Sequence, residues 1–243
     1  MNQSSEQLNL KPGDIISHQT EDGDWSTVKI LLLDEWPDGS FAAHCMTYHS
    51  TPEKPTKSTV NELSVFIWHA PIDAASFSNG WELIDTQPVV ENELNGFLEY
   101  LKQTDFPRYL DFTEQDAEQV INQANEHYQQ AYALGTEGKH QEAIAEYTKA
   151  IEYFPLFYEA IDNRAFSYMD LGDYESALND FESSLQVEPN GDAAFFSKGE
   201  CLMKLGKLKE AEAIFQAGLE RFPEHKEIFD EFLNTTKSLL AKG

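Results

Sequence analysis

The strongest constraint on the fold is a period of 34 residues in the second half of the chain. A proline, a glycine, an alanine, an aromatic and a small residue each keep this period over three copies: Pro155, Pro189 and Pro223; Gly138, Gly172 and Gly206; Ala143, Ala177 and Ala211; Tyr147, Phe181 and Phe215; Ala131, Ala165 and Gly199. Five independent columns with one spacing indicate a structural repeat. A unit this short cannot bury its own apolar surface, so the copies have to stack on one another.

One copy, residues 158–191, shows what each unit forms. Apolar residues recur at helical spacing over 161–168 and again over 174–185, which predicts two amphipathic helices. Gly172 lies between them, because glycine readily adopts the left-handed conformation that ends a helix. Pro189 ends the second helix, since proline cannot continue one. Each copy is therefore predicted to be an antiparallel helix pair.

At these columns the chain resembles the tetratricopeptide-repeat family. The resemblance covers about residues 124–216 as three units, and residues 226–240 look like the solvating helix that caps such arrays. Thr113 and the acidic Asp116 predict a helix N-cap, after which the first helix is expected to run to about Leu134.

The first ninety residues lack helical periodicity and read as five short strands, at 14–18, 27–34, 41–49, 65–70 and 81–85, with a turn at 36–39. They predict either a small twisted sheet or an SH3-like barrel. Residues 89–103 look helical. The sequence thus predicts an α+β protein with a β-rich domain at 1–90, a helical linker at 91–112 and a superhelix of three repeats plus a capping helix at 113–243.

The charge balance narrows the range of partners. The chain has 43 acidic and 17 basic side chains and a formal net charge of -26. Such a surface repels phosphate backbones and anionic lipid, so we expect no nucleic-acid and no membrane partner. A partner protein with a basic segment is the positive interpretation. The alternative is that the charge only keeps the protein in solution.

Two features favour a cytoplasmic protein. The amino-terminal residues lack the basic and then apolar run of a signal peptide, and no apolar stretch approaches the length of a membrane span. The two cysteines, Cys45 and Cys201, lie in different halves of the chain, which fits a reducing compartment.

The resemblance also implies a binding surface. In tetratricopeptide repeats the first helix of each pair lines a concave groove that holds peptides or partner helices. The groove positions carried over to this sequence are Tyr128, Tyr132, Asp162, Asn163, Phe166, Met169, Phe196, Glu200 and Met203. The aromatic and methionine residues would be apolar anchors, and the carboxylates would select a basic segment. The alternative is that neighbouring helices or the amino-terminal domain cover these side chains.

One function of the family can be tested on the residues. Repeats that bind the acidic C-terminal tails of heat-shock chaperones use a clamp of lysines, an arginine and two asparagines. Here only Asn163 stands at a clamp position, and the others are Tyr128, Tyr132, Ala193 and Ser197. None of these carries the positive charge that a carboxylate needs. The sequence therefore predicts that the partner is not a chaperone C-terminal tail.

A second resemblance concerns the first domain. Gly13-Asp14-Ile15, Trp81-Glu-Leu-Ile84 and Pro88-Val89 resemble a family of bacterial immunity proteins, which neutralise toxins delivered between competing cells. The resemblance implies an alternative function, in which the acidic amino-terminal domain binds a basic toxin such as a nuclease.

An enzyme is the third and least favoured alternative. His44, Cys45 and His49 invite a metal or nucleophile interpretation, but neighbouring residues of a strand point to opposite faces. His18 or His69 would have to complete a site through folding. No phosphate-binding loop, zinc-binding helix or nucleophile elbow occurs. We therefore predict a protein-interaction module with no catalytic residue, metal or cofactor.

Overall fold

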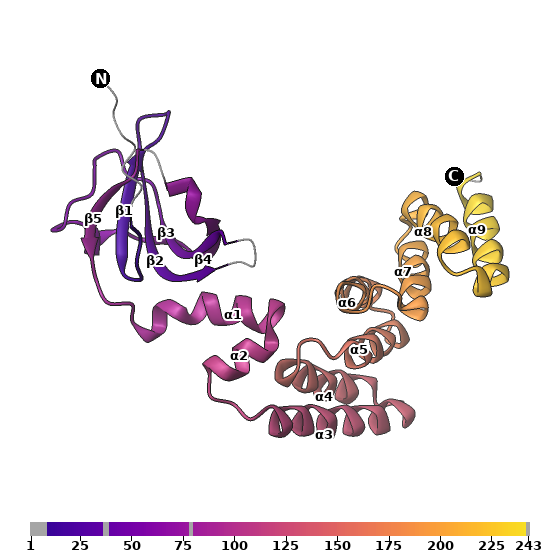
Figure 1. Ribbon diagram of the computed structural model, residues 1–243. Helices are drawn as coiled ribbons and strands as arrows, with labels where there is room; N and C mark the ends of the chain where they lie inside the picture. Colours follow the sequence, from indigo (N-terminus) through magenta and orange to yellow (C-terminus); the bar gives the residue numbers. More distant parts are fainter. Residues whose placement is uncertain (1–8, 36–38, 78–79, 242–243) are drawn as a thin grey trace. The chain divides into compact units, whose positions relative to one another are not determined.

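The computed structural model describes residues 9–35, 39–77 and 80–241, and the chain divides into two compact units, residues 1–109 and 110–243 (Figure 1). Two predictions fall partly outside the described residues: the turn, at positions 36–38, and the absence of a signal peptide, at residues 1–8. No helix in the described ranges is long and apolar enough to cross a membrane.

The first unit contains one antiparallel sheet of five strands. They are β1 (Asp14–Gln19), β2 (Trp25–Glu35), β3 (Phe41–Tyr48), β4 (Val65–Asp73) and β5 (Glu82–Thr86), in the spatial order β4-β3-β2-β1-β5. Each strand lies within a few residues of its predicted position. Over the described residues β4 and β5 do not pair with each other, so the sheet is open and has two edges.

Alternation along the strands gives the sheet two different faces. One face is apolar, and its core contains Ile16, Val28, Ile30 and Cys45 with Phe77 of the 3-10 helix η2 (Ala74–Phe77). Two further short 3-10 helices are η1 (Val60–Glu62), which precedes β4, and η3 (Glu91–Leu94), which follows β5.

The other face buries polar side chains. The Lys29 ammonium donates to both carboxylate oxygens of Glu93 in η3 at 2.7 Å and to the Pro88 carbonyl at 3.1 Å. Helix α1 (Asn95–Thr104) covers the same face, with its Phe97 ring centroid 4.8 Å from that of His44. The segment predicted as a linker therefore supplies, through α1, a layer of the first unit. Helix α2 (Phe106–Phe112) crosses the boundary between the units.

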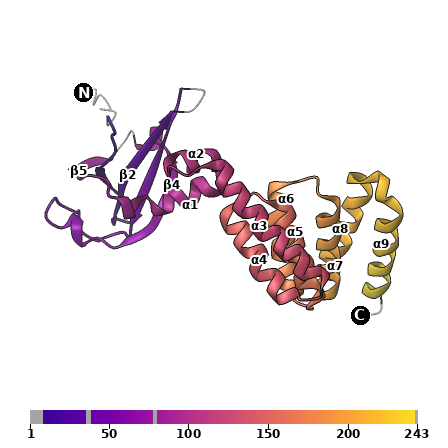
Figure 2. The same cartoon turned by 90° about the horizontal axis from the view of Figure 1, so that it is seen from below.

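The second unit is a stack of helix pairs, which Figure 2 shows from another side. Its helices are α3 (Ala117–Thr136), α4 (His140–Tyr153), α5 (Tyr158–Asp170), α6 (Tyr174–Val187), α7 (Asp192–Lys204), α8 (Leu208–Arg221) and α9 (Lys226–Leu240), with η4 (Pro223–His225) before the last. Each helix packs on the next one in sequence. Three repeats and a capping helix are therefore present, as the periodic columns predicted.

The repeat columns have the packing roles expected of them. Gly138, Gly172 and Gly206 all have φ between 74° and 78°, the left-handed region that favours glycine. The small and aromatic columns face each other across a helix pair. At Gly199 a Cβ atom would lie 2.6 Å from the Phe215 ring, so the small column exists because the aromatic one fills the space.

The start of the first repeat differs from the prediction. The N-cap of α3 is Asp116, whose carboxylate accepts a hydrogen bond from the Gln119 amide at 2.7 Å. Thr113 lies one turn too early, because Glu114 has φ of 55° and interrupts the helical path there.

Candidate functional site

All nine candidate groove residues lie on the first helices of the three pairs. Helix α3 carries two of them, α5 carries four and α7 carries three. Most are spaced by three or four residues along their helix, which places them on one side of it. The structure thus places all nine positions on first helices, as the repeat register implies, but it gives them different degrees of exposure.

Tyr132 and Phe166 are the two candidates with open aromatic rings. The side chain of Tyr132 is 53 % exposed and that of Phe166 is 36 % exposed. The Phe166 ring packs edge-on against Phe181 of α6, with centroids 5.1 Å apart. Phe166 is therefore held in place on one side while its other side remains available for a contact.

Tyr128 and Asn163 contact each other. The Asn163 side-chain amide donates to the Tyr128 hydroxyl at 3.0 Å, which joins α3 to α5. The Tyr128 ring also tilts against Phe157 at 4.9 Å, and burial raises the pKa of its hydroxyl. These two side chains hold neighbouring repeats together.

The remaining apolar candidates are partly buried and pack against the core of the stack. Phe196 lies among the rings of α8 and α9, with its centroid 4.8 Å from that of Phe232. Met169 and Met203 pack against the same buried cluster. Neighbouring helices therefore cover part of each of these three side chains.

Two carboxylates on this side are partly withdrawn from water. Oδ1 of Asp162 is buried and has no hydrogen-bond partner within the described ranges, and burial raises the pKa of its carboxyl group. Burial also raises the pKa of Glu200, against an opposing effect of Lys204. A desolvated carboxylate gains more from a cationic partner than an exposed one does.

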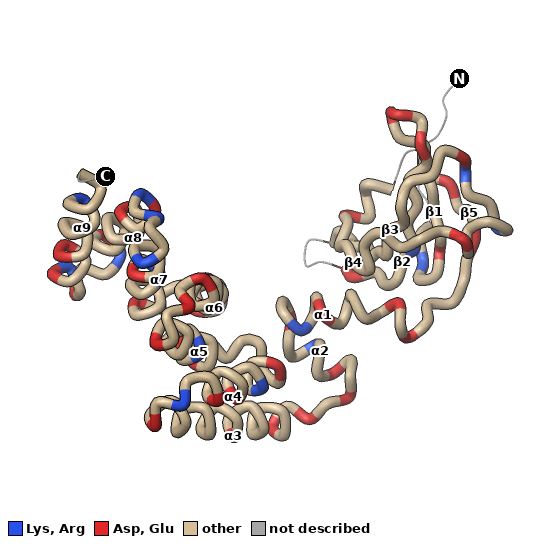
Figure 3. The backbone as a smooth tube through the Cα atoms, turned by 180° about the vertical axis from the view of Figure 1, so that it is seen from behind, with Lys and Arg blue, Asp and Glu red and all other residues tan. Residues whose placement is uncertain are grey.

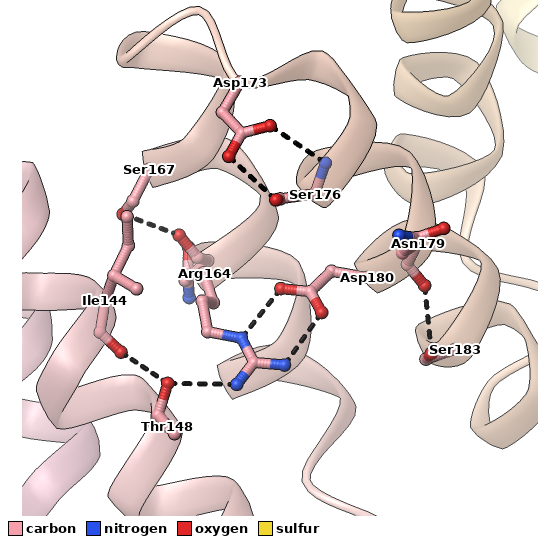
Figure 4. A network of polar contacts seen from close by, with 10 residues as sticks. Ile144, Thr148, Arg164, Ser167, Asp173, Ser176, Asn179, Asp180 and Ser183 are labelled. Atoms are coloured by element: carbon pink, nitrogen blue, oxygen red, sulfur yellow. Dashed lines mark hydrogen bonds and ion pairs between the residues drawn. The ribbon is translucent and has the colours of Figure 1, made fainter.

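Sequence reasoning missed a polar network that joins α4, α5 and α6 (Figure 4). The Arg164 guanidinium donates to both carboxylate oxygens of Asp180 at 2.7 Å and to the Thr148 hydroxyl at 3.0 Å. Arg164 is thus committed inside the stack. The repeat period could not reveal the pair, because the equivalent positions in the neighbouring copies are Gln130 with Glu146 and Lys198 with Ile214.

The first unit holds a second polar network, which folding assembles around His44. His44 Nδ1 lies 2.8 Å from His69 Nε2, and His44 Nε2 lies 2.9 Å from a carboxylate oxygen of Asp34. Arg108 pairs with the same carboxylate, at 2.7 Å through Nη2. Asp34, His44 and Arg108 border a cavity of about 250 Å³ that is also lined by Tyr100.

This network joins the sheet to the helices beside it and so stabilises the first unit. His69 did join His44 through folding, as the metal interpretation required, but the described residues contain no group of three or more His, Cys, Asp and Glu placed to hold a metal ion. Cys45 points into the opposite, apolar core, and burial raises the pKa of its thiol to about 12. It is therefore not paired with an imidazole as a nucleophile would be.

Comparison with known proteins matches two segments of the second unit to family models described as tetratricopeptide repeat, at residues 127–155 and 168–230. Among curated relatives, small glutamine-rich tetratricopeptide repeat-containing protein 2 of Mycosarcoma maydis is 30 % identical over 42 % of this chain. Hsp70-Hsp90 organizing protein 3 of Arabidopsis thaliana is 28 % identical over 44 %. The matches span 28 % and 19 % of the lengths of these two relatives.

Similar solved structures cover about half of the chain. The first tetratricopeptide repeat of Spaghetti (RPAP3), bound to HSP90 peptide SRMEEVD, is 26 % identical over 50 % of this chain and 95 % of its own, with a TM-score of 0.47. The second such domain of human RPAP3, in complex with HSP70 peptide SGPTIEEVD, is 28 % identical over 49 % and 98 %, with a TM-score of 0.46.

These findings correct one prediction. We excluded a chaperone C-terminal tail as partner because the basic clamp is missing. That exclusion is wrong, since curated relatives of this region are named Hsp70-Hsp90 organizing proteins. The physical error was to treat one set of charged contacts as necessary. Amide and apolar contacts also contribute to the binding of a peptide.

Both family-model matches lie in the second unit, so the resemblance of the first domain to immunity proteins stays a prediction. The period, the left-handed glycines, the stacked helix pairs and the matched family models agree with one another. The C-terminal half of this chain, over residues 127–230, consists of tetratricopeptide repeats.

Proposed function

We propose that the second unit binds a segment of another protein along the side formed by α3, α5 and α7, and that the chain performs no chemistry there. The observation that carries the proposal is the exposure of Tyr132 and Phe166 on adjacent first helices. Large aromatic side chains left open on a rigid scaffold are typical anchors of protein interfaces.

The neighbouring charges favour a segment with apolar and basic side chains. Asp162 lies on α5 with Phe166, Glu200 lies on α7, and burial disfavours the charged forms of both carboxylates. A lysine or arginine placed beside them would relieve that cost. Arg164, a cation on α5, is already paired with Asp180.

A chaperone C-terminal tail is the second candidate, because of the names of the relatives and the peptides in the similar structures. The tail peptides are acidic, so they would have to avoid the two carboxylates and use the amide of Asn163 and the lysine at 204. The two candidates differ in the sign of charge that the surface accepts.

Calorimetric titration of the full chain distinguishes them. The probes are the peptide SRMEEVD and a peptide of leucine and lysine of equal length, each at low and at high salt. We expect the leucine–lysine peptide to bind, and Tyr132→Ala and Phe166→Ala each to weaken binding about tenfold, the usual cost of losing an aromatic anchor.

The matched control is Tyr153→Ala, which removes an exposed tyrosine from α4, a second helix of a pair, and leaves the affinity unchanged. Binding of SRMEEVD alone, with the same dependence on Tyr132 and Phe166, would establish the second candidate. Affinities that none of these substitutions changes would show that this side of the stack is not the binding site.

A further inference from the structure

The two edges of the sheet in the first unit are built differently. The β5 edge is short and charged: Glu82 pairs with Lys54 at 2.5 Å, and Asp85 pairs with Lys57 at 3.1 Å. Short length, charge and covering side chains are the means by which proteins keep an edge strand from pairing with another chain.

The β4 edge lacks these protections over its first half. Phe66, Ile67 and Trp68 follow one another and are 61 %, 42 % and 49 % exposed. No acidic side chain, lysine or arginine occurs in β4 before Asp73. Within the described ranges β4 pairs with β3 alone, so its outer backbone groups have no strand beside them. Three consecutive exposed apolar residues on an edge strand indicate a surface that is covered in function.

The open part of the edge is short and has defined ends. Helix α1 approaches β4 at Gly96, where a Cβ atom would lie 2.9 Å from both the Trp68 backbone and the His69 side chain. Pro71 has no N–H group to donate. The stretch that can accept a new strand is therefore Val65–Trp68, enough for the core of a short extended peptide.

The charges around this stretch are negative. Glu62 precedes β4 in η1, Asp73 ends the strand, and Glu99 lies one turn after Gly96 on α1; all three are exposed. The basic side chains of this unit are largely neutralised by ion pairs, at Lys29, Lys54, Lys57 and Arg108. Figure 3 shows acidic residues spread along both units. A second copy of a chain with net charge -26 would be repelled at this edge.

We propose that β4 is a docking edge for an extended segment of a partner protein, a short apolar stretch flanked by lysines or arginines. The segment adds as a further strand beside Val65–Trp68. Its apolar side chains cover Phe66, Ile67 and Trp68, and its flanking cations face Glu62 at one end and Glu99 at the other. This surface belongs to the first unit and does not depend on the binding side of the repeats.

The test uses the full chain and a defined probe, a peptide of three valines with two lysines at each end. Binding is followed by the amide resonances of residues 65–68 and their hydrogen exchange. We expect these amides to shift and to gain protection. The same peptide with N-methylated valines keeps its charge and side chains but cannot form a strand, so it should bind at least about tenfold more weakly.

Variants locate the site on one edge. The double substitution Phe66→Ala with Trp68→Ala should weaken binding, whereas Leu83→Ala, which removes a 51 % exposed residue from β5, should not. Equal binding of the N-methylated peptide would overturn the proposal, because the affinity would then be charge attraction alone. A concentration-dependent dimer in sedimentation that Phe66→Ala with Trp68→Ala abolishes would also overturn it, because a second copy would then occupy the edge.

Discussion

Each unit of this protein is stabilised by polar contacts within it, and these contacts span very different distances along the chain in the two units. In the first unit, Arg108 pairs with Asp34 and Lys29 with Glu93, across 74 and 64 residues. In the second, Arg164 pairs with Asp180 across 16 residues, and Asn163 reaches Tyr128 across 35, about one repeat. The first unit is stabilised by contacts between segments far apart in the sequence. The second unit is stabilised by contacts between neighbouring repeats.

The difference teaches where each unit is vulnerable. A stack of repeats has a stability that is roughly the sum of local terms, so damage stays near its origin. A sheet whose distant segments are joined by buried ion pairs loses much of its stability when one ion pair is broken. The comparison can be measured directly, because all four tryptophans precede residue 82 while most helices lie in the second unit. Tryptophan fluorescence therefore reports the first unit, and circular dichroism at helical wavelengths reports mainly the second.

The largest effect is expected from Glu93→Gln in the first unit. It leaves the Lys29 ammonium, whose side chain is almost completely buried, without its charge partner, and we expect a loss of about 3 kcal/mol in the free energy of unfolding. Urea unfolding followed by tryptophan fluorescence measures it. The double variant Lys29→Met with Glu93→Leu should recover much of the loss. An equal shift in the helical signal would show that the two units unfold as one, against the comparison.

Gly218→Ala tests the second unit. A Cβ atom there would lie 2.2 Å from the ring of Phe229, which is buried between α8 and α9 and cannot move away freely. Overpacking of this kind costs about 1–3 kcal/mol. The loss should appear in the helical signal and not in the tryptophan signal. Hydrogen exchange should place it in α8 and α9, and a loss spread evenly from α3 to α9 would contradict the picture of local terms.

A pH titration tests the buried histidine of the first unit. Burial, with a smaller effect of His44, lowers the pKa of His69 from its ordinary value of 6.5 to about 4. The folded state therefore binds fewer protons than the unfolded one, so stability is full above pH 6.5 and falls as the pH drops towards 4. Arg108 holds the pKa of Asp34 below its usual 3.8, so that contribution is lost only at still lower pH.

The midpoint of thermal unfolding, read by tryptophan fluorescence between pH 7 and pH 4.5, checks this expectation. His69→Phe keeps an aromatic ring against Phe97 and removes the titrating group, so the dependence above pH 4.5 should become smaller. A variant with an undiminished dependence would assign the effect to other groups.

The smallest expected effect is an increase in the stability of the second unit. Gly135 lies inside α3, and a Cβ atom there would meet only the Cβ of Ala143, at an ordinary 4.0 Å. Gly135→Ala should therefore stabilise the second unit by about 0.5–1 kcal/mol, because alanine loses less backbone freedom on folding. The helical signal in urea measures the gain. A loss of stability would mean that α3 and α4 pack more closely than the structure shows.

The repeat unit was predictable because its physics is local. Within one period, Gly172 indicates the turn, Ala177 indicates close packing of the two helices, and Phe181 indicates the side chain that fills the core. The strand positions of the first unit were predictable for a similar reason, since alternation and turn residues act over a few residues. The binding surface was less predictable. Phe196 and Met203 have the right register but point into contacts with neighbouring helices, a matter of packing that periodicity does not report.

The sequence by itself determined the repeat architecture, the five strands and the acidic surface, because each depends on the spacing of residue types along a short stretch or on a sum over the chain. Only the tertiary structure decided that α1 belongs to the sheet, that His44, His69, Asp34 and Arg108 meet, and that β4 is an open edge while β5 is a protected one. These features depend on which distant segments become neighbours. That choice follows from the packing of the whole unit, and no local pattern encodes it.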